Sequence, residues 1–291
     1  MNEKKQPYTL KYFSAFCAEG SAAKEELVRV SDRVSLRVFK IRPAQENNNP
    51  VIIFVPGWIT QPVSWKNVLA EITKDFPVIY VETREKRGGL SKGEKDFSIY
   101  AMSEDLINVI KYYNPGQGGF VLFGSSLGAS LILHSAGNLP VKPKAIVLIA
   151  PNAEFKVPFF WKIIITFFYP PLYFLIKPPV KWYLRKFRMN IEKDRAQYEK
   201  YANAIDAADP WKLKRAIMSL WKYKIWNSLK GIDIPCLFIG GSHDKLHEPE
   251  STKLMIDIIP ESVYIDMKTN SATHSREMVY HLREFLKQGN K

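Results

Sequence analysis

The chain contains only two cysteines, Cys17 and Cys236, among its 291 residues. Two thiols cannot supply the disulfide framework that stabilises many small secreted domains. Residues 1–7 are mostly polar, and they are not followed by the short apolar segment of a secretory signal peptide. We therefore expect a cytoplasmic protein without a secretory signal.

Long uninterrupted apolar runs are also missing. Residues 157–176 are the most apolar part of the chain, yet the uncharged run within them, residues 163–176, has only 14 residues. A helix that crosses a bilayer requires about 20 apolar residues, and Pro170 and Pro171 would break such a helix in its middle. We therefore expect no transmembrane helix in this region.

Acidic residues are in the minority, since 29 Asp and Glu accompany 42 Lys and Arg, for a net charge of +13. Residues 154–230 hold 16 of the basic and 6 of the acidic residues, and also 18 of the 38 aromatic residues. No nucleic-acid-binding motif accompanies this segment, so we expect no nucleic-acid partner. Its charge indicates a solvated face, and peripheral contact with an anionic membrane surface is the alternative.

Six short apolar runs, separated by helical patterns, indicate strands that are buried on both faces of a sheet. They are residues 51–55, 77–81, 120–123, 145–150, 235–239 and 263–267. Residues 27–30 and 33–41 instead alternate apolar and polar side chains, as an antiparallel hairpin with one solvated face does. This order predicts an α/β fold, with a mostly parallel sheet that helices cover on both faces.

Three further features are weaker. Residues 1–25 show no clear periodicity, and residues 84–96, which are polar and rich in glycine and lysine, indicate a loop. Ser64 and Ser103 each precede a helical pattern, so we expect helices to begin at these two residues.

The segment Gly124-Ser-Ser-Leu-Gly128 lies directly after a predicted strand and before a predicted helix. It matches Gly-x-Ser-x-Gly, a pattern whose serine sits on a sharp strand-to-helix turn. Ser126 has a glycine two residues away on either side, whereas the corresponding neighbours of Ser125 are large and apolar. We therefore predict that Ser126 is a nucleophile at a helix N-terminus, with an ordinary glycine-rich turn as the alternative.

A serine nucleophile needs a histidine as base and a carboxylate that orients it. The chain has five histidines: His134, His243, His247, His274 and His281. We predict that His274 is the base, because it follows the last predicted strand, at the sheet edge where open α/β folds place their sites. Asp244 follows the strand at residues 235–239 and is the predicted acid, with a turn-forming aspartate as the alternative. His134 falls within a predicted helix and is expected to pack there.

An oxyanion formed at the nucleophile needs two preorganised backbone N–H groups. Leu127, the residue after the nucleophile, offers one at the start of the helix. Pro56, Gly57 and Trp58 follow the first buried strand. We predict that Trp58 offers the second N–H group and that Gly57 lets the backbone pass close to the substrate. An ordinary turn at the end of a strand is the alternative.

In these features the chain resembles the α/β-hydrolase superfamily, and in particular its cap-bearing esterases and lipase-like enzymes. The resemblance rests on the Gly-x-Ser-x-Gly turn and on the chain order Ser126, Asp244, His274. It covers about residues 27–153 and 231–288. It implies an eight-stranded, mostly parallel sheet, a Ser-Asp-His triad and a helical cap inserted after the sixth strand.

The same resemblance implies a division of the chain into a core, residues 1–153 and 231–291, and a cap, residues 154–230. The inner face of the cap is expected to line a substrate cavity with aromatic side chains, and its outer face is expected to be basic. The chain departs from many relatives at Pro56, where they have histidine, and at Ser125, where they have a larger residue.

These residues together predict a serine hydrolase that cleaves carboxylic esters of medium or long acyl chains, lipid-derived esters included. Ser126 would form an acyl-enzyme, His274 would transfer the proton, and Asp244 would orient the imidazole ring. A thioesterase or an acyltransferase with the same triad is an alternative, and so is a non-catalytic binding protein on the same fold. We expect a small acyl ester or lipid as substrate, and neither a metal nor another cofactor.

Overall fold

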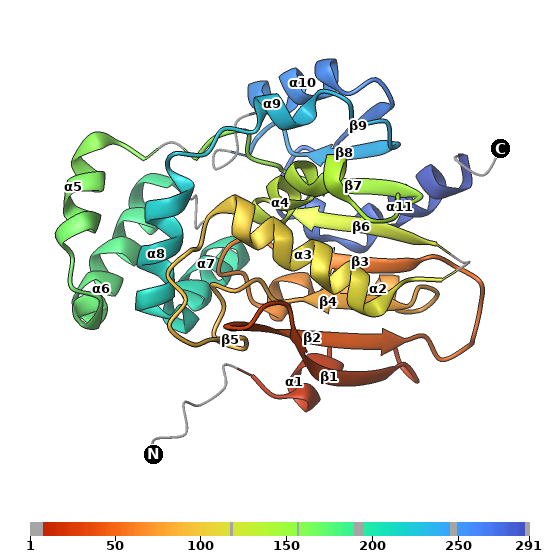
Figure 1. The fold of residues 1–291 in the computed structure, drawn as a ribbon, viewed down its shortest axis with the longest axis horizontal. Helices are drawn as coiled ribbons and strands as arrows, with labels where there is room; N and C mark the ends of the chain where they lie inside the picture. The colour runs from red at the N-terminus through yellow and green to blue at the C-terminus, as the bar shows by residue number, and fades with distance from the viewer. Residues whose placement is uncertain (1–7, 117–118, 156, 189–194, 245–248, 289–291) are drawn as a thin grey trace.

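The computed structural model describes residues 8–116, 119–155, 157–188, 195–244 and 249–288. Its centre is a sheet with the strand order β1-β2-β4-β3-β6-β7-β8-β9, and the short strand β5 pairs with β2 (Figure 1). The strands are β1 (Ala22–Arg29), β2 (Val34–Arg42), β3 (Val51–Val55), β4 (Val78–Val81), β5 (Leu90–Ser91), β6 (Phe120–Ser125), β7 (Ala145–Ile149), β8 (Cys236–Gly240) and β9 (Ser262–Asp266). The eight expected strands form the continuous sheet, and β5 is additional.

Strands β4, β3, β6, β7, β8 and β9 pair in parallel, while β1 and β2 form an antiparallel hairpin, and β2 also pairs antiparallel with β4. The predicted α/β-hydrolase fold with a mostly parallel sheet is therefore confirmed. Parallel neighbours cannot be joined by tight turns, so each connection crosses a face of the sheet, usually as a helix. The carboxyl ends of the parallel strands consequently meet at one edge.

Helices cover both faces of the sheet. They are α1 (Leu10–Ser14), α2 (Lys66–Ile72), α3 (Ile99–Tyr113), α4 (Leu127–Ser135), α5 (Phe159–Phe167), α6 (Tyr173–Tyr183), α7 (Arg195–Ala207), α8 (Pro210–Leu220), α9 (Trp226–Leu229), α10 (Pro249–Ile258) and α11 (Arg276–Gln288). Successive strand side chains alternate between two cores, so Ile53 of β3 packs with α3 and α4 while Phe54 packs with α1, α2 and α11. The uninterrupted apolar runs of the sequence thus fill both cores.

The N-terminal region is more ordered than its lack of periodicity indicated. Residues 10–14 form α1, and β1 begins at Ala22 rather than near residue 27. The ring of Phe13 is fully buried and stacks on that of Phe39 at 4.1 Å. A five-residue helix is too short to show a period, and the first part of β1 lies at the sheet edge with exposed side chains. Neither element could therefore be recognised from hydrophobic spacing.

Both expected helix starts are wrong by a few residues. Helix α3 begins at Ile99, and the side chain of Ser98 caps it by accepting from the Ala101 N–H at 3.2 Å. Ser103 lies inside this helix and is buried. Ser64 lies within a short 3-10 turn, and α2 starts only after it, at Lys66. In both cases a residue other than the expected serine occupies the position at which the helix begins.

No single helix in the described ranges is long and apolar enough to cross a membrane. One pair of segments, Phe159–Phe167 and Pro170–Phe187, meets the length and composition of a span only when taken together, and it is bent by 110°. This pair contains α5 and α6, which lie at the edge of the molecule with α7 and α8 between them and the sheet (Figure 1).

The loop after β4 buries charged residues. Arg84 forms a two-pronged ion pair with Asp105 of α3, with N–O distances of 2.6 and 2.7 Å. Lys86 and Glu85 are also buried and lie 2.9 Å apart. Charged residues in a glycine-rich loop are usually solvated, but here α3 and α8 cover the first part of the loop, and Arg84, Glu85 and Lys86 each have a charged partner inside the protein. Lys212 of α8 donates to two carbonyls of this loop.

Glu82, at the start of the same loop, is buried and accepts a hydrogen bond from the Tyr8 hydroxyl. Burial raises the pKa of Glu82 to about 8, although the nearby Lys86 charge opposes this shift. The ordinary pKa of glutamate in an unfolded chain is about 4.3. Between these two pH values, the folded protein keeps a proton that the unfolded chain has lost. This contribution to stability is full below about pH 4.3 and is lost as the pH rises through about 8.

The first prediction concerns the proton that Glu82 keeps in the folded protein. In Glu82→Gln, which mimics the protonated side chain, the fall of the unfolding free energy between pH 5 and 8 should become shallower by about 1 kcal/mol per pH unit. Denaturant unfolding at several pH values measures this slope. The control is Glu104→Gln on the exposed side of α3, which should leave the slope unchanged. An unchanged slope in Glu82→Gln would show that Glu82 is already ionised in the folded protein.

Candidate active site

The turn between β6 and α4 holds Ser126 in a strained backbone conformation. Its φ is 48° and its ψ is −114°, a combination that residues other than glycine rarely adopt. The Ser126 N–H donates to the Ile149 carbonyl at 2.8 Å, and the Ser126 carbonyl accepts from the Ser130 N–H at 3.0 Å. Ser126 is partly exposed, whereas Ser125 is buried. The strand-to-helix turn therefore lies where the sequence predicted it.

Two glycines let α4 approach the sheet. A Cβ on Gly124 would lie 2.7 Å from the backbone nitrogen of Ala129, and a Cβ on Gly128 would overlap the carbonyl oxygen of Val55. Neither contact is possible without a movement of the backbone. The glycines of the Gly-x-Ser-x-Gly pattern are thus required by the close packing of α4 on β3 and β6.

The loop after β3 passes directly beside this turn. A Cβ on Gly57 would lie 3.3 Å from the Cβ of Ser126, so the peptide that joins Gly57 to Trp58 borders the serine. The Leu127 N–H lies at the start of α4, next to the same side chain. Ile59 has a φ of 49°, which is strained for a β-branched residue. The two predicted oxyanion donors, Trp58 and Leu127, therefore both belong to peptides adjacent to Ser126.

A buried lysine, which the sequence did not single out, holds this loop. Lys86 donates from Nζ to the Gly57 carbonyl at 2.9 Å, and the Thr60 N–H donates to the same oxygen at 3.2 Å. In a planar trans peptide the carbonyl and the following N–H point in opposite directions. The bond to Lys86 therefore also sets the direction of the Trp58 N–H. Nothing local in the sequence marks Lys86, because its partner is 29 residues away.

Asn152 is a second residue that the sequence analysis missed. Its Nδ2 lies 2.9 Å from the Ser126 Oγ, and its carbonyl accepts from the Ser130 hydroxyl at 2.8 Å. Because the amide donates to the serine oxygen, the serine proton remains available to a base. Asn152 follows β7, the neighbour of β6, so the rule that directs attention to the carboxyl ends of adjacent strands could have found it.

The predicted acid and base meet through Asn270. Asp244 is buried after β8, and its Oδ2 accepts from the Asn270 side chain at 2.9 Å. The backbone carbonyl of the same asparagine lies 2.9 Å from Nδ1 of His274. Burial, and the Asp244 charge to a smaller extent, raise the pKa of the Tyr201 hydroxyl on α7. The structure thus brings Asp244 and His274 to one loop junction, with Asn270 as the link.

The contacts of His274 define its tautomer. Its Nδ1 faces the Asn270 carbonyl, which only accepts, and its Nε2 lies 2.8 Å from Nζ of Lys200, which only donates as an ammonium group. The proton is therefore on Nδ1, and Nε2 presents its lone pair. The ring stacks on Trp65 at 4.0 Å, which fixes its plane. Lys200, from α7, was not anticipated from the sequence.

The other histidines have different surroundings. His134 of α4 lies 3.1 Å from the Ser228 hydroxyl and 3.0 Å from that of Tyr223, and burial lowers its pKa. It therefore packs as expected. His243 is exposed, His281 is partly exposed on α11, and His247 lies outside the described residues. In the described ranges, no cluster of three or more His, Cys, Asp or Glu side chains could hold a metal ion.

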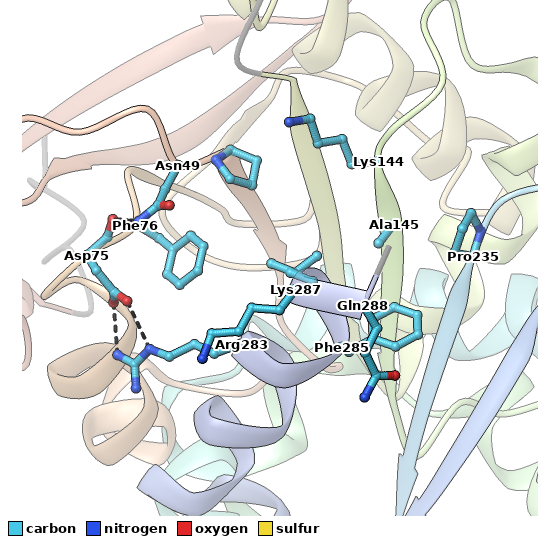
Figure 2. Close-up of a pocket in the computed structure, with 12 residues that line it drawn as sticks. Asn49, Asp75, Phe76, Lys144, Ala145, Pro235, Arg283, Phe285, Lys287 and Gln288 are labelled. Atoms are coloured by element: carbon cyan, nitrogen blue, oxygen red, sulfur yellow. Dashed lines mark hydrogen bonds and ion pairs between the residues drawn. The ribbon is translucent and has the colours of Figure 1, made fainter. Parts of the chain in front are cut away.

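A pocket of about 230 Å³ opens beside His274. Polar side chains dominate its wall, among them Lys200 and Asn203 of α7 and Lys66 of α2. A larger pocket of about 470 Å³ lies at the amino ends of β7 and β8, beside α11 (Figure 2). Its charged groups are largely paired, as the Arg283 contact with Asp75 shows in Figure 2. That pocket contains no serine, cysteine or histidine and lies at the opposite edge of the sheet from Ser126.

The segment between β7 and β8 reaches the site mainly through polar residues. Helix α7 brings Lys200 and Tyr201 to the loop of His274 and Asp244. Helices α5 and α6 instead bury no residue, and most of their aromatic side chains are exposed. The expected aromatic inner face is therefore wrong for α5 and α6. Hydrophobic composition predicts that a helix buries one face, but it does not show whether another part of the protein covers that face.

Comparison with known proteins agrees with this architecture. The family model described as "Serine aminopeptidase, S33" matches residues 88–267, which is more than half of the chain. No curated protein matches the sequence.

Several solved structures share the fold. A hydrolase from Pseudomonas aeruginosa PA01 is 15% identical, with a TM-score of 0.74 over 91% of this chain and 98% of that one. An enol-lactonase from Burkholderia xenovorans LB400 is 16% identical, with a TM-score of 0.69 over 87% and 97%. A thermophilic esterase from Thermogutta terrifontis is 16% identical, with a TM-score of 0.68 over 93% and 100%. At such identities the similarity shows the fold alone.

The second prediction concerns the packing at the turn. In Gly128→Ala, the new methyl group should force α4 away from β3 and lower the unfolding free energy by about 1–3 kcal/mol. Gly137→Ala is the matched control, because a Cβ there meets no atom within 4 Å. Denaturant unfolding of both variants gives the comparison. Equal stability of the two would mean that α4 can shift without cost.

Proposed function

The chain belongs to the serine aminopeptidase S33 family of α/β hydrolases, and on this premise we propose that it is a serine hydrolase that cleaves carboxylic esters. One observation carries the proposal: the strained Ser126 backbone, pinned at the strand-to-helix turn beside the Gly57 peptide. Strain of this kind persists only where the surrounding structure imposes it, and it is common at reactive residues. It leaves Ser126 partly exposed beside the Gly57–Trp58 peptide, which supports the proposed role of the Trp58 and Leu127 N–H groups.

In the proposed reaction, the Ser126 Oγ attacks the ester carbonyl and passes its proton to Nε2 of His274. The tautomer of His274 supports this role, since Nε2 carries the lone pair. Lys200 donates to that lone pair in the structure, so this ammonium group must move aside before the proton transfer. Asp244 stabilises the imidazolium through the loop that Asn270 ties to it.

The negative charge that forms on the carbonyl oxygen is held by the N–H groups of Leu127 and Trp58. Protonated His274 then returns its proton to the leaving alcohol, and the acyl-enzyme forms on Ser126. Water, activated by the same histidine, attacks the acyl carbon, so that the carboxylic acid leaves and the serine is regenerated. No step needs a metal or another cofactor.

The charge beside His274 favours a neutral or acidic substrate over an amine. Lys66 and Lys200 line the pocket together with a single carboxylate, Glu199. A free ammonium group close to Nε2 of His274 would be repelled by the ammonium group of Lys200, which lies 2.8 Å from that nitrogen, whereas Asn270 links Asp244 to the ring. We therefore propose an ester rather than an N-terminal peptide as substrate. A thioester substrate or an alcohol acceptor in place of water would use the same residues.

The acyl chain is proposed to be of medium or long length. Burial of each additional CH₂ contributes about 0.8 kcal/mol, so kcat/KM should rise about fourfold per carbon until the chain fills its site. A series of p-nitrophenyl esters of increasing length measures this dependence. A best substrate of acetyl size would rule out the chain-length part of the proposal and leave the serine mechanism intact.

The third prediction tests the nucleophile. Ser126→Ala should abolish both esterase turnover and labelling by a fluorophosphonate probe, because only the hydroxyl is lost. Ser125→Ala, one residue away and buried, should retain the labelling. Circular dichroism would verify that both variants are folded. Labelling of Ser126→Ala would assign the nucleophile to another residue, and no labelling of the unmodified protein would favour a non-catalytic binding protein on the same fold.

The fourth prediction concerns Lys86 as a positioning residue. Lys86→Met removes the donor that holds the Gly57 carbonyl, so the Trp58 N–H should lose its fixed direction. We expect kcat to fall about 10–100-fold with little change in KM, since an oxyanion interaction acts mainly in the transition state. Lys212→Met is the control, because Lys212 donates to the carbonyls of Lys86 and Gly89 but not to that of Gly57. An equal loss in both variants would assign Lys86 to loop stability alone.

A further inference from the structure

Helices α5 and α6 expose an unusual amount of apolar surface. The segment Phe159–Phe167 and the segment Pro170–Phe187 together hold 11 of the 22 large hydrophobic residues that are exposed in the described part of the chain. Phe159 is 77% exposed, Phe167 84% and Phe174 64%. Contiguous exposed apolar surface of this kind is unfavourable in water and usually marks an interaction site.

The side of α6 that faces the protein is already occupied. Tyr173 donates to the Ile205 carbonyl at 3.1 Å, and Lys177 and Lys181 both pair with Asp206 of α7. These three residues are four positions apart and so lie along one face of the helix. The exposed Phe174, Leu175, Trp182 and Tyr183 belong to the remaining, outward face.

Helix α5 is attached in a similar way. Its last turn receives two hydrogen bonds from Nζ of Lys214 on α8, to the carbonyls of Thr166 and Phe168. The ammonium group of Lys162 lies over the ring of Trp221 at 5.8 Å. Both helices are therefore held on the protein side by α7 and α8, which separate them from the sheet (Figure 1). Their apolar side chains are presented away from it.

The charge of this region has one sign. Residues 158–187 contain five Lys and Arg and no Asp or Glu. Arg185 and Lys186 form no ion pair within the ranges that the structure describes, and Lys186 lies over the Trp182 ring at 5.4 Å. Aromatic rings, flanked by basic side chains without acidic ones, suit the boundary between anionic lipid headgroups and acyl chains.

We propose that α5 and α6 form a docking surface for a bilayer that carries anionic lipids. The two helices lie in the plane of the headgroups, with the aromatic side chains inserted and Arg185 and Lys186 against the phosphates. The proposed mode is peripheral: no single described helix is long enough to span, and the pair that meets the length and composition only together is bent by 110°. The inference concerns binding and is independent of the proposed catalysis.

A second copy of the chain fits this surface less well. In a symmetric dimer each patch would meet the same patch of the other copy, so one interface would gather Arg185 and Lys186 of both copies, and residues 158–187 contain no Asp or Glu to pair with them. Like charges opposed across an interface are repelled. An anionic lipid surface instead provides the opposite charge together with an apolar layer.

The fifth prediction tests the proposal by sedimentation with vesicles. At low salt the protein should bind vesicles of phosphatidylcholine mixed with phosphatidylglycerol, and phosphatidylcholine alone should bind it more weakly. Arg185→Gln with Lys186→Gln should weaken the partition to anionic vesicles about 30-fold, from about 1 kcal/mol per basic side chain. The control pair is Lys111→Gln with Lys253→Gln, two exposed lysines elsewhere, and it should bind like the unmodified protein.

The apolar contribution needs its own variant. Replacement of Phe159, Phe160, Phe167 and Phe174 by serine should remove binding to anionic vesicles even at low salt. The control replaces four exposed tyrosines outside the two helices, Tyr12, Tyr100, Tyr112 and Tyr280, by serine, and binding should remain. Brominated lipids should quench Trp161 and Trp182 fluorescence in the unmodified protein.

Three outcomes would overturn the proposal. The first is an absence of binding to anionic vesicles at low salt. The second is a dimer by light scattering that the phenylalanine variant loses, which would assign the patch to a second copy. The third is resistance of the bound protein to extraction by alkaline carbonate, which would indicate a membrane span. Because each readout is a binding measurement, it stays separate from the activity tests of Ser126.

Discussion

The close approach of α4 to β3 is the constraint on which the site depends. It requires Gly124 and Gly128, and it leaves Ser126 at a φ of 48° between a strand and a helix. Strain of this kind costs about 1–3 kcal/mol and cannot be sustained by a short peptide. It is offset because α4 is almost completely buried and because the Ser126 N–H bonds to β7. The strained turn at Ser126 can therefore form only because β3, β6 and β7 are neighbours in this order in the sheet.

The buried part of the loop after β4 also constrains the backbone beside Ser126. Lys86 connects this loop to the Gly57 carbonyl, Arg84 connects it to α3, and Lys212 connects it to α8. Buried charges are costly unless each has a partner, so removal of one partner disturbs the others. The loop thus couples the segment between β7 and β8 to the backbone beside Ser126. Helix α8, far along the sequence, contributes in this way to the burial of the loop.

The segment between β7 and β8 presents two different chemistries. Helix α7 directs Lys200 toward His274, and the Asp244 charge raises the pKa of the Tyr201 hydroxyl on the same helix, so the part that reaches the site is polar. Helices α5 and α6 present aromatic side chains outward, and the exposed Arg185 and Lys186 follow shortly after α6. A single composition count over residues 154–230 averages these two regions. Residues 158–187 hold 11 of the 18 aromatic residues of this segment but only 5 of its 16 basic residues. The aromatic excess therefore belongs mainly to the outward helices, which explains why composition predicts an aromatic lining that α5 and α6 do not supply.

The sequence alone determined the class of fold, the order of the strands and the position of the Gly-x-Ser-x-Gly turn. These features follow from local rules, because buried strands need continuous apolar runs and a sharp turn needs small residues within a span of five. It also indicated Asp244 and His274 as candidates, since each follows a strand and the carboxyl ends of parallel strands share one edge.

Only the tertiary structure decided which polar groups complete the site. Asn152 is 26 residues from Ser126, and Lys200 is 74 residues from His274. It also decided that the charged loop after β4 is buried and that the aromatic helices α5 and α6 are exposed. Hydrophobic periodicity shows on which side of a segment its own apolar side chains lie. Whether a charge is buried, or an apolar face covered, depends on the distant segment that packs against it.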